Sequence, residues 1–468
     1  MRFRHCIVNA VLCHACTLQA QHWQQLGPGT NWGVRVLYSD TVAGALYVGG
    51  NFRYIGDPFL SGDTLVVNGI ARWDGTGYSP LATGLDACDN FSCDPVLCIA
   101  RFQDEIYCNT DKSMSGVPAK GIARWDGTGW GPVGEGLLGW FGNPGAAVCL
   151  LEHGGGLYVG GTFLQAGADT AYSIARWDGQ YWHSMDFPAP DFATFGSMAV
   201  YGGELYVAGN FLATLDGQPT HDVARFDGSQ WHAVGGGLKG PLASADDLAV
   251  FNGELYVCGY IEKSQGNAGN MVMKLVEGEW VDVAGGADGQ VHCMAVFNGE
   301  LYVAGAFSSV GDGIPASNIA KWTGDRWCSL GSEFNNRILA MEVFNGELYV
   351  GGGFTEVDGD TVRYIAKWTG GSYTGSCGEP LGVGTITGED ARLFPNPARE
   401  TAELYLPAGL AAGAGLRLFA VTDQQVLYQE VQAGPNTVEL AGLPPGIYFY
   451  EVGDGGKVLQ AGKLVKVE

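Results

Sequence analysis

The stretch Leu301-Tyr302-Val303-Ala304-Gly305-Ala306-Phe307 decides the fold, because versions of it return along the chain. Each copy is followed by a segment like Ile319-Ala320-Lys321-Trp322 and then by an aromatic such as Trp327. The copies begin at Leu46, Ile106, Leu157, Leu205, Leu255, Leu301 and Leu348. Strand-like units with glycine-rich turns that repeat about every 50 residues are typical of a β-propeller with one blade per repeat. The sequence therefore predicts an all-β fold with a seven-bladed propeller over residues 21–378, six or eight blades being the alternatives.

The two ends of this repeat array indicate how the ring closes. The seventh copy reaches Trp368 but is followed by no fourth strand of its own. The segment Trp23-Gln24-Gln25-Leu26-Gly27 instead matches the fourth-strand pattern of Trp327-Cys328-Ser329-Leu330-Gly331. We expect the N-terminal segment to supply the outer strand of the last blade, which hides a sheet edge and locks the ring.

Charge and hydropathy restrict the environment and the partners of this chain. The net charge is −24, with 25 Lys and Arg against 49 Asp and Glu. Such a surface repels phosphate backbones and anionic membranes, so nucleic acid is not an expected partner. Residues 1–20 combine a basic start, an apolar core and a cleavage-like Leu18-Gln19-Ala20, which predicts a signal peptide. No other apolar stretch is long enough to cross a bilayer, so we expect an exported protein without a transmembrane segment.

Cysteine positions suggest two disulfides, because an exported chain meets an oxidising environment. Cys88 and Cys93 flank a short loop, and Cys98 and Cys108 lie on the two arms of one predicted hairpin, so either pair could be bonded. Cys98, Cys149 and Cys293 share one inner-strand position in three repeats. We interpret them as small buried packing residues rather than as metal ligands.

Loop lengths divide the propeller into two faces. The turns between first and second and between third and fourth strands are short, whereas the other connections vary in length and form what we call the long-loop face. Its longest members, 53–69, 84–95, 138–146 and 186–195, interleave carboxylates with aromatics that suit stacking on sugar rings or gripping a protein. The alternative is that these aromatics only pin long loops to the propeller. The candidate binding residues are Tyr54, Phe59, Phe91, Trp140, Phe141, Phe187, Phe192 and Phe195.

Signatures of chemistry are sparse. The chain has no GxSxG elbow, HExxH helix or P-loop, and the GxGxxG matches at 134–139 and 235–240 lack the helix that a dinucleotide site requires. Asp246 and Asp247 precede an inner strand, and we expect them at the mouth of the central channel as candidate binding or acid–base residues. No cofactor is expected. Calcium is the one possible exception, because loop carboxylates are ligands that this ion prefers. The alternative is that these carboxylates only belong to solvated turns. The residues are Asp216, Asp312, Asp358 and Asp360.

A basic residue recurs in the third strand of the repeats. It stands beside an aromatic residue and alternates with apolar neighbours, so we interpret it as a cation–π or inter-blade ion-pair partner rather than as a binding ring. The positions are Arg72, Arg124, Arg176, Arg225, Lys321 and Lys367.

The composition changes after Cys377, where a linker is expected at 379–390. A second β pattern then opens with Leu393-Phe394-Pro395-Asn396-Pro397, continues with Gly446-Ile447-Tyr448 and ends with Gly462-Lys463-Leu464-Val465-Lys466. These three motifs, in this order, resemble the type A C-terminal sorting domain of the type IX secretion system. The motif residues that carry the resemblance are Pro395, Asn396, Pro397, Gly446, Tyr448, Gly462, Lys463 and Lys466.

The strand pattern itself predicts a small β-sandwich at 391–468, and the resemblance implies export across the outer membrane. It also implies the secretion machinery and its sortase as partners, and a secreted or cell-surface location. The propeller repeats resemble kelch-like propellers more loosely, and that likeness implies a fold but no activity.

The functional hypothesis is a secreted or cell-surface binding propeller, with a glycan or a protein as the ligand of the long-loop face. A polysaccharide-acting hydrolase or lyase that uses acidic residues at the channel mouth is the first alternative. A purely structural surface protein is the second. The missing nucleophile and metal signatures favour binding over catalysis.

Overall fold

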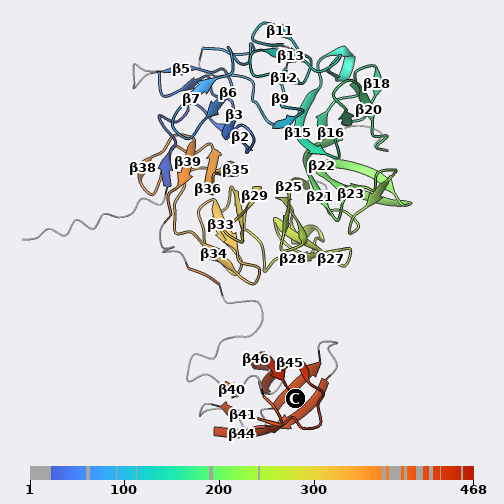
Figure 1. The fold of residues 1–468 in the computed structure, drawn as a ribbon, viewed down its shortest axis with the longest axis vertical. Helices are drawn as coiled ribbons and strands as arrows, with labels where there is room; N and C mark the ends of the chain where they lie inside the picture. Colours follow the sequence, from blue (N-terminus) through green and yellow to red (C-terminus); the bar gives the residue numbers. More distant parts are fainter. Residues whose placement is uncertain are drawn as a thin grey trace, which may run out of the picture.

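A ring of four-stranded antiparallel sheets accounts for most of the described chain (Figure 1). The computed structural model describes residues 23–58, 64–90, 92–111, 113–188, 193–240, 243–370, 376–378, 392–394, 398–406, 415–420, 425–432, 434–454 and 457–467. The signal peptide expected at 1–20 and the linker expected at 379–390 lie outside these residues.

The first four blades, each given from its inner to its outer strand, follow one another along the chain. They are β2 (Val34–Asp40), β3 (Ala45–Gly50), β6 (Ile70–Trp73) and β7 (Tyr78–Pro80); β8 (Ile99–Phe102), β9 (Glu105–Cys108), β12 (Ala123–Trp125) and β13 (Trp130–Pro132); β15 (Ala146–His153), β16 (Gly156–Thr162), β19 (Ile174–Trp177) and β20 (Trp182–Ser184); and β21 (Thr194–Tyr201), β22 (Glu204–Leu215), β23 (Gln218–Phe226) and β24 (Trp231–Ala233).

The last three blades continue the same order, except that the seventh takes its outer strand from the start of the described chain. They are β25 (Ser244–Phe251), β26 (Glu254–Tyr260), β27 (Val272–Val276) and β28 (Glu279–Asp282); β29 (Val291–Phe297), β30 (Glu300–Gly305), β33 (Ile319–Trp322) and β34 (Trp327–Ser329); and β35 (Ile338–Phe344), β36 (Glu347–Gly352), β39 (Ile365–Trp368) and β1 (Trp23–Gln25).

Ring closure rests on two contacts between the ends of the array. Strand β1 pairs antiparallel with β39, with Trp23 opposite Trp368. The inner strand β2 of blade 1 also lies against the inner strand β35 of blade 7, as each inner strand does with that of the next blade. The described residues therefore form a closed seven-bladed β-propeller, as the repeat predicts.

An aromatic residue at the start of each outer strand joins its blade to the preceding one. Its polar hydrogen is donated to an oxygen just beyond the outer strand of that blade, so that the bonds run around the whole ring. The pairs are Tyr78 to Leu26, Trp130 to Leu81, Trp182 to Val133, Trp231 to Met185, Trp280 to Val234 and Trp327 to Val283, all to carbonyls, and Trp23 to the hydroxyl of Ser332. Buried indoles need such a partner, which explains why Trp recurs at this position.

Four of the six predicted basic residues of the third strands are paired within their own blades. Their partner is a glutamate at the start of the second strand, as in Arg124 with Glu105 at 2.8 Å and Lys321 with Glu300 at 2.7 Å. The expected inter-blade or cation–π role was wrong for these residues, because the antiparallel register brings the two ends of the same hairpin together. The same pairing holds for Arg225 with Glu204 and Lys367 with Glu347.

A disulfide between Cys328 and Cys377 fastens the chain beyond blade 7 to the outer strand of blade 6. Residues 376–378 extend that sheet, since Ser329 N–H donates to the carbonyl of Ser376 and Gly378 N–H to that of Trp327. The sequence reasoning missed this bond, because Cys377 lies outside the repeat and has no equivalent in other blades.

A second β unit follows, in two sheets around its own apolar core. One sheet has the order β40 (Arg392–Phe394), β41 (Thr401–Leu406) and β44 (Gly434–Glu439). The other has the order β43 (Gln425–Glu430), β42 (Gly415–Ala420), β45 (Gly446–Asp454) and β46 (Lys457–Lys466).

Candidate functional site

Short β-hairpins connect the loops of the long-loop face by backbone hydrogen bonds. They connect the second and third strands of five blades, and the loop that enters a blade pairs with the hairpin of that blade, as Leu85 does with Met114. The short strands are β4 (Tyr54–Ile55), β5 (Leu65–Val66), β10 (Ser113–Met114), β11 (Val117–Pro118), β14 (Leu137–Leu138), β17 (Gln165–Ala166), β18 (Asp169–Thr170), β31 (Ser309–Val310), β32 (Ile314–Pro315), β37 (Glu356–Val357) and β38 (Asp360–Thr361). The face is therefore a hydrogen-bonded scaffold on which side chains are held in place.

Six inner strands carry a β-bulge near the long-loop face, and a glycine explains it. In blade 6 the register shifts between Val291 and Cys293, so that His292 is the extra residue. A Cβ on Gly305, the partner of Val291, would lie 2.1 Å from the carbonyl oxygen of Gln290. Blade 2 has Thr110 at the equivalent position and no bulge between its described strands. The recurring glycine of the repeat thus permits the bulge.

The bulge residues differ between blades, unlike the residues around them. They are Arg35, Val148, Gly196, Asp246, His292 and Leu339. Bulges are common beside functional sites because they redirect one side chain. This ring of variable residues around the propeller axis is the first part of the candidate site.

Asp246, one of the predicted site residues, is tied to blade 6. Its Oδ2 accepts a hydrogen bond from Gln290 Nε2 at 2.6 Å and lies 3.1 Å from His292 Nδ1. The side chains of Asp246 and His292 keep 22% and 16% of their exposure, so this pair remains accessible to solvent.

Asp247 is a bracing residue between three inner strands. Its carboxylate accepts hydrogen bonds from Ser197 Oγ of blade 4 and from the backbone N–H groups of Leu248 and Met294, at 2.8 to 2.9 Å. Burial is the main reason that its pKa rises to about 6. The structure therefore gives the Asp247 carboxylate a bracing role, while Asp246 and Asp247 both remain partly exposed.

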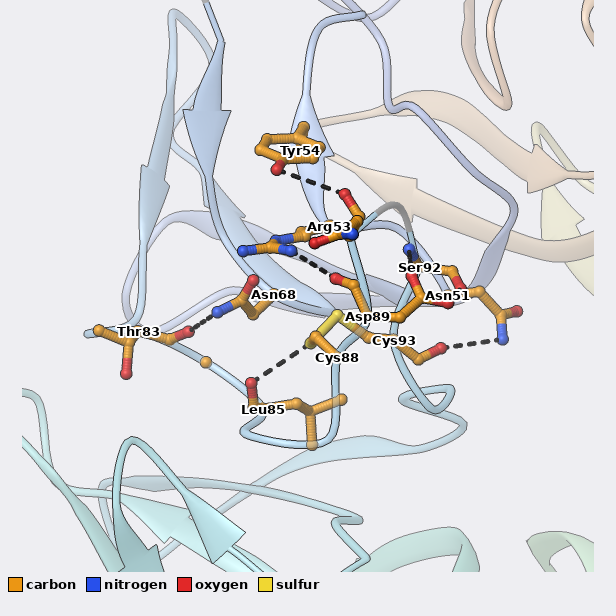
Figure 2. Close-up of a disulfide and its surroundings, with 12 residues drawn as sticks. Asn51, Arg53, Tyr54, Asn68, Thr83, Leu85, Cys88, Asp89, Ser92 and Cys93 are labelled. Atoms are coloured by element: carbon orange, nitrogen blue, oxygen red, sulfur yellow. Dashed lines mark hydrogen bonds between the residues drawn. A yellow bond between two sulfur atoms is a disulfide. The ribbon is translucent and has the colours of Figure 1, made fainter. Parts of the chain in front are cut away.

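Figure 2 shows the loop closed by the disulfide between Cys88 and Cys93. Arg53 donates to the carbonyl of Asp89, and Tyr54 Oη donates to that of Asn90 at 3.5 Å. The Arg53 guanidinium carbon lies 5.4 Å from the centre of the Tyr54 ring. Tyr54 is half-buried and holds this loop in place. The predicted residues Phe59, Phe91 and Phe192 lie outside the described residues.

Trp140 and Phe141 are the predicted aromatics that the structure displays. They occupy the turn η1 (Trp140–Gly142), where Gly139 N–H donates to Asn143 O at 2.8 Å and Asn143 N–H returns to Trp140 O at 3.2 Å. Trp140 is 40% exposed and Phe141 is 99% exposed. Phe141 also has a φ of 58°, a left-handed conformation that costs about 1 kcal/mol or more for such a residue. An apolar side chain is thus held in water at a conformational cost.

Phe187 and Phe195, two of the candidate binding residues, match the alternative expectation that the loop aromatics pin the long loops. Both are buried, and the Phe187 ring makes edge contacts with Phe195, Phe211 and Trp231 at centroid distances of 5.0, 5.1 and 4.9 Å. This aromatic cluster fills the core beneath the loop between blades 3 and 4, so these side chains pin the loop instead of contacting a ligand.

The predicted bond between Cys98 and Cys108 is also wrong, since both are free buried thiols. Cys108 stands opposite Ile99, and Cys98 is one residue out of register. Because successive side chains of a strand point to opposite faces, the two sulfurs lie on different sides of blade 2. Cys98 and Cys108 accordingly belong to different core clusters.

Two of the loop carboxylates named as calcium candidates take part in local hydrogen bonds. Asp216 binds the His232 ring and the N–H of Ala233, and Asp358 Oδ1 accepts from Glu333 N–H at 2.7 Å. Among the described residues, no group of three or more His, Cys, Asp or Glu side chains could hold a metal ion.

The β45–β46 ladder brings the sorting-motif residues together. Gly446 is paired with Lys466, Phe449 with Lys463 and Tyr450 with Gly462. Tyr448 is buried and donates its hydroxyl proton to the carbonyl of Pro444 at 2.7 Å. Pro395, Asn396 and Pro397 lie outside the described residues, but Ala398, which follows them, bridges to Lys466.

Comparison with known families identifies this second unit. Residues 392–467 match the family described as the secretion system C-terminal sorting domain. The chain therefore carries a sorting domain of the type IX secretion system, which interacts with that machinery, and the protein is exported to the cell surface or the extracellular space. In the part of the chain that the structure describes, no helix is long and apolar enough to span a membrane.

Remote structural likenesses accompany this match. PorZ from Porphyromonas gingivalis, described as an essential bacterial surface component of the type IX secretion system, is 14% identical over 92% of this chain, with a TM-score of 0.42. The extracellular domain of the hybrid two-component system BT4673 from B. thetaiotaomicron is 12% identical over 94%, with a TM-score of 0.46. This chain spans only 59% and 57% of those two chains. YjhT is 14% identical over 62% of this chain and 95% of its own, with a TM-score of 0.34.

Likenesses this remote carry no argument about function. Comparison with curated proteins gave no significant match.

Proposed function

We propose that this protein is an exported binding propeller that holds a glycan or a protein ligand on its long-loop face. In this proposal, residues 21–378 are the exported propeller of kelch-like repeats and residues 391–468 are the sorting signal that the secretion sortase recognises. The bulge ring and the displayed aromatics both belong to the propeller.

The Trp140–Phe141 turn is the observation that carries the proposal. An almost fully exposed phenylalanine in a left-handed conformation is unfavourable on its own, because it presents apolar surface to water and strains the backbone. Hydrogen bonds from Gly139 and Asn143 nevertheless hold this turn in one shape. A preformed aromatic contact of this kind suits a sugar ring or a hydrophobic recess on a protein, since little conformational freedom is lost on binding.

A polysaccharide-acting enzyme is the alternative that depends on Asp246 and Asp247. Both carboxylates are occupied by donors from neighbouring strands. Asp246 lies beside His292, and Asp247 accepts three hydrogen bonds, so neither of these two carboxylates stands unbound as the acid or base of a two-carboxylate glycosidase mechanism. We therefore favour binding without turnover.

A glycan array with the purified full chain tests this function, with analysis of the sugars that remain after incubation. Retention of a ligand without chain shortening supports a binding propeller. Release of shortened or unsaturated products would instead support the enzyme. If neither glycans nor surface proteins of the same cell are retained, the structural alternative is favoured.

A further inference from the structure

Two arginines meet where blade 7 closes against blade 1. Arg35 is the bulge residue of β2, and Arg337 directly precedes the first residue of β35, Ile338. The neighbouring inner strands β2 and β35 are in contact. Packing is tight here, since a Cβ on Gly351 of blade 7 would lie 2.4 Å from a methyl group of Val34. The two guanidinium groups are therefore brought to the same junction on the long-loop face.

These two side chains differ from the described arginines that pair with a carboxylate. Arg101 pairs with Asp40, Arg225 with Glu204 and Arg363 with Asp57. Within the described ranges, neither Arg35 nor Arg337 forms an ion pair. Arg35 Nε donates to Asn51 Oδ1 at 2.9 Å, which fixes the guanidinium and leaves its Nη groups available.

The juxtaposition has an electrostatic consequence. Burial, and then the charge of Arg337, lower the pKa of Arg35 from its ordinary value, although a guanidinium still remains charged at neutral pH. In a chain with a net charge of −24, acidic partners are plentiful, yet this junction contains two adjacent cations. An oxyanion bound between them would relieve their repulsion.

An exposed indole lies close to Arg35 along the chain. Trp32, in the loop that leads from β1 into β2, keeps 52% of its exposure. Its backbone is fixed, because Thr30 Oγ1 donates to the Trp32 carbonyl at 2.7 Å. Indole faces stack on sugar rings, and paired guanidinium forks bind carboxylates or sulfates.

We propose that Trp32, Arg35 and Arg337 form a subsite for an acidic sugar residue of a polysaccharide, with its carboxylate or sulfate between the two guanidinium groups. The subsite rests on the proposed binding function and names the class of ligand for it. The indole decides between ligand classes, because it offers a sugar ring a stacking surface beside the charge, whereas an acidic peptide would need only the arginines.

The test compares three oligosaccharides of equal length by isothermal titration with the purified full chain: an oligogalacturonate, a sulfated galactan and a neutral galactan. We expect at least one acidic oligosaccharide to bind at least tenfold more tightly than the neutral one. Arg35→Gln and Arg337→Gln should each weaken acidic binding about tenfold, and Trp32→Ala should weaken it as well. Which acidic sugar binds more tightly distinguishes a carboxylate from a sulfate ligand.

Arg326→Gln is the matched control, because it removes the same charge from the turn between β33 and β34 on the opposite face and should leave the affinity unchanged. The melting temperature of each variant confirms that it is folded.

Equal affinity for acidic and neutral sugars, or unchanged acidic binding by the double Arg35→Gln, Arg337→Gln variant, would overturn the subsite. Preference for poly-glutamate over every sugar would also overturn it, in favour of an acidic protein partner. These results differ from failure of the proposed function, in which the wild-type chain retains no ligand at all.

Discussion

The indole Nε1 of Trp327 in blade 6 donates a hydrogen bond to the carbonyl of Val283 in blade 5 at 2.8 Å. Corresponding bonds join every pair of neighbouring blades, with a tyrosine donor in blade 1 and a serine hydroxyl acceptor for Trp23, so the ring is held by polar contacts at its outer strands as well as by apolar packing between the sheets.

Removing this bond should destabilise the propeller. We predict that Trp327→Phe lowers the free energy of unfolding by about 1–3 kcal/mol, because the buried Val283 carbonyl loses its donor. Urea unfolding followed by circular dichroism measures the change. Trp140→Phe, at an exposed site, should change it by less than about 0.5 kcal/mol. Equal effects of the two substitutions would contradict the role of the bond.

Adding a single methyl group at a bulge should also destabilise the protein. In Gly305→Ala the new Cβ would lie 2.1 Å from the carbonyl oxygen of Gln290. We expect this overpacking of the inner hairpin to lower the free energy of unfolding by about 1–3 kcal/mol. Gly129→Ala is the matched control, since nothing lies within 4 Å of a Cβ there. Thermal melts of both variants decide the point, and a Gly305→Ala protein as stable as the control would show that the glycine is not required.

A buried carboxyl group makes the stability depend on pH. Burial raises the pKa of Asp222 to about 7, and its described partner is the N–H of Phe211. The folded state therefore holds a proton that the unfolded state releases near pH 4, so stability is greatest below pH 4 for this group and falls as pH rises to about 7. Burial also raises the pKa of Asp247 to about 6 and that of Glu342 to about 7. The stability contributed by these two groups therefore also falls as the pH rises.

Asp222→Asn should stabilise the protein at pH 8 by about 2–4 kcal/mol and flatten this part of the pH dependence. Blade 6 already has an asparagine in the same left-handed conformation, Asn318, which accepts from Phe307 and donates to the Phe334 carbonyl. Melting temperatures between pH 4 and 8 test the prediction, with the exposed Asp312→Asn as control. Parallel profiles for wild type and Asp222→Asn would contradict it.

The two disulfides should differ in their contribution to stability. The Cys328–Cys377 bond spans a sequence separation of 49 residues and the Cys88–Cys93 bond one of 5. Loop-closure entropy predicts losses of about 4 and about 2 kcal/mol when they are replaced by serine pairs. Melting of the two double variants under non-reducing conditions measures this order. A larger loss for Cys88→Ser with Cys93→Ser would refute it.

The repeat was sufficient to predict the blades, because its strand periods and turns are local properties of the sequence. The bulge glycines, such as Gly305, recur because the same bulge returns within the inner hairpins of six blades, and the outer-strand tryptophans recur because each blade meets the same neighbours. The β1 segment could be recognised for the same reason, since Trp23 forms the same inter-blade contact as Trp327.

Side-chain exposure in the loops could not be predicted in this way. Phe141 and Phe187 both stand in long, aromatic loops, yet one is exposed and the other fills a core. The difference depends on the tertiary position of each loop, which no local pattern encodes. Arg35 and Arg337 were missed because they lie far apart in sequence and meet only when the ring closes.

The binding of ligand by a Trp140→Ala, Phe141→Ala double variant tests the central claim most directly. Tyr181→Ala provides the control, because Tyr181 is 61% exposed on a third-to-fourth strand turn of the opposite face. With a ligand identified from the array, we predict that the double variant keeps the wild-type melting temperature and binds at least tenfold more weakly, while Tyr181→Ala binds as wild type does. Unchanged affinity in the folded double variant would contradict the claim that the long-loop face binds the ligand through this turn.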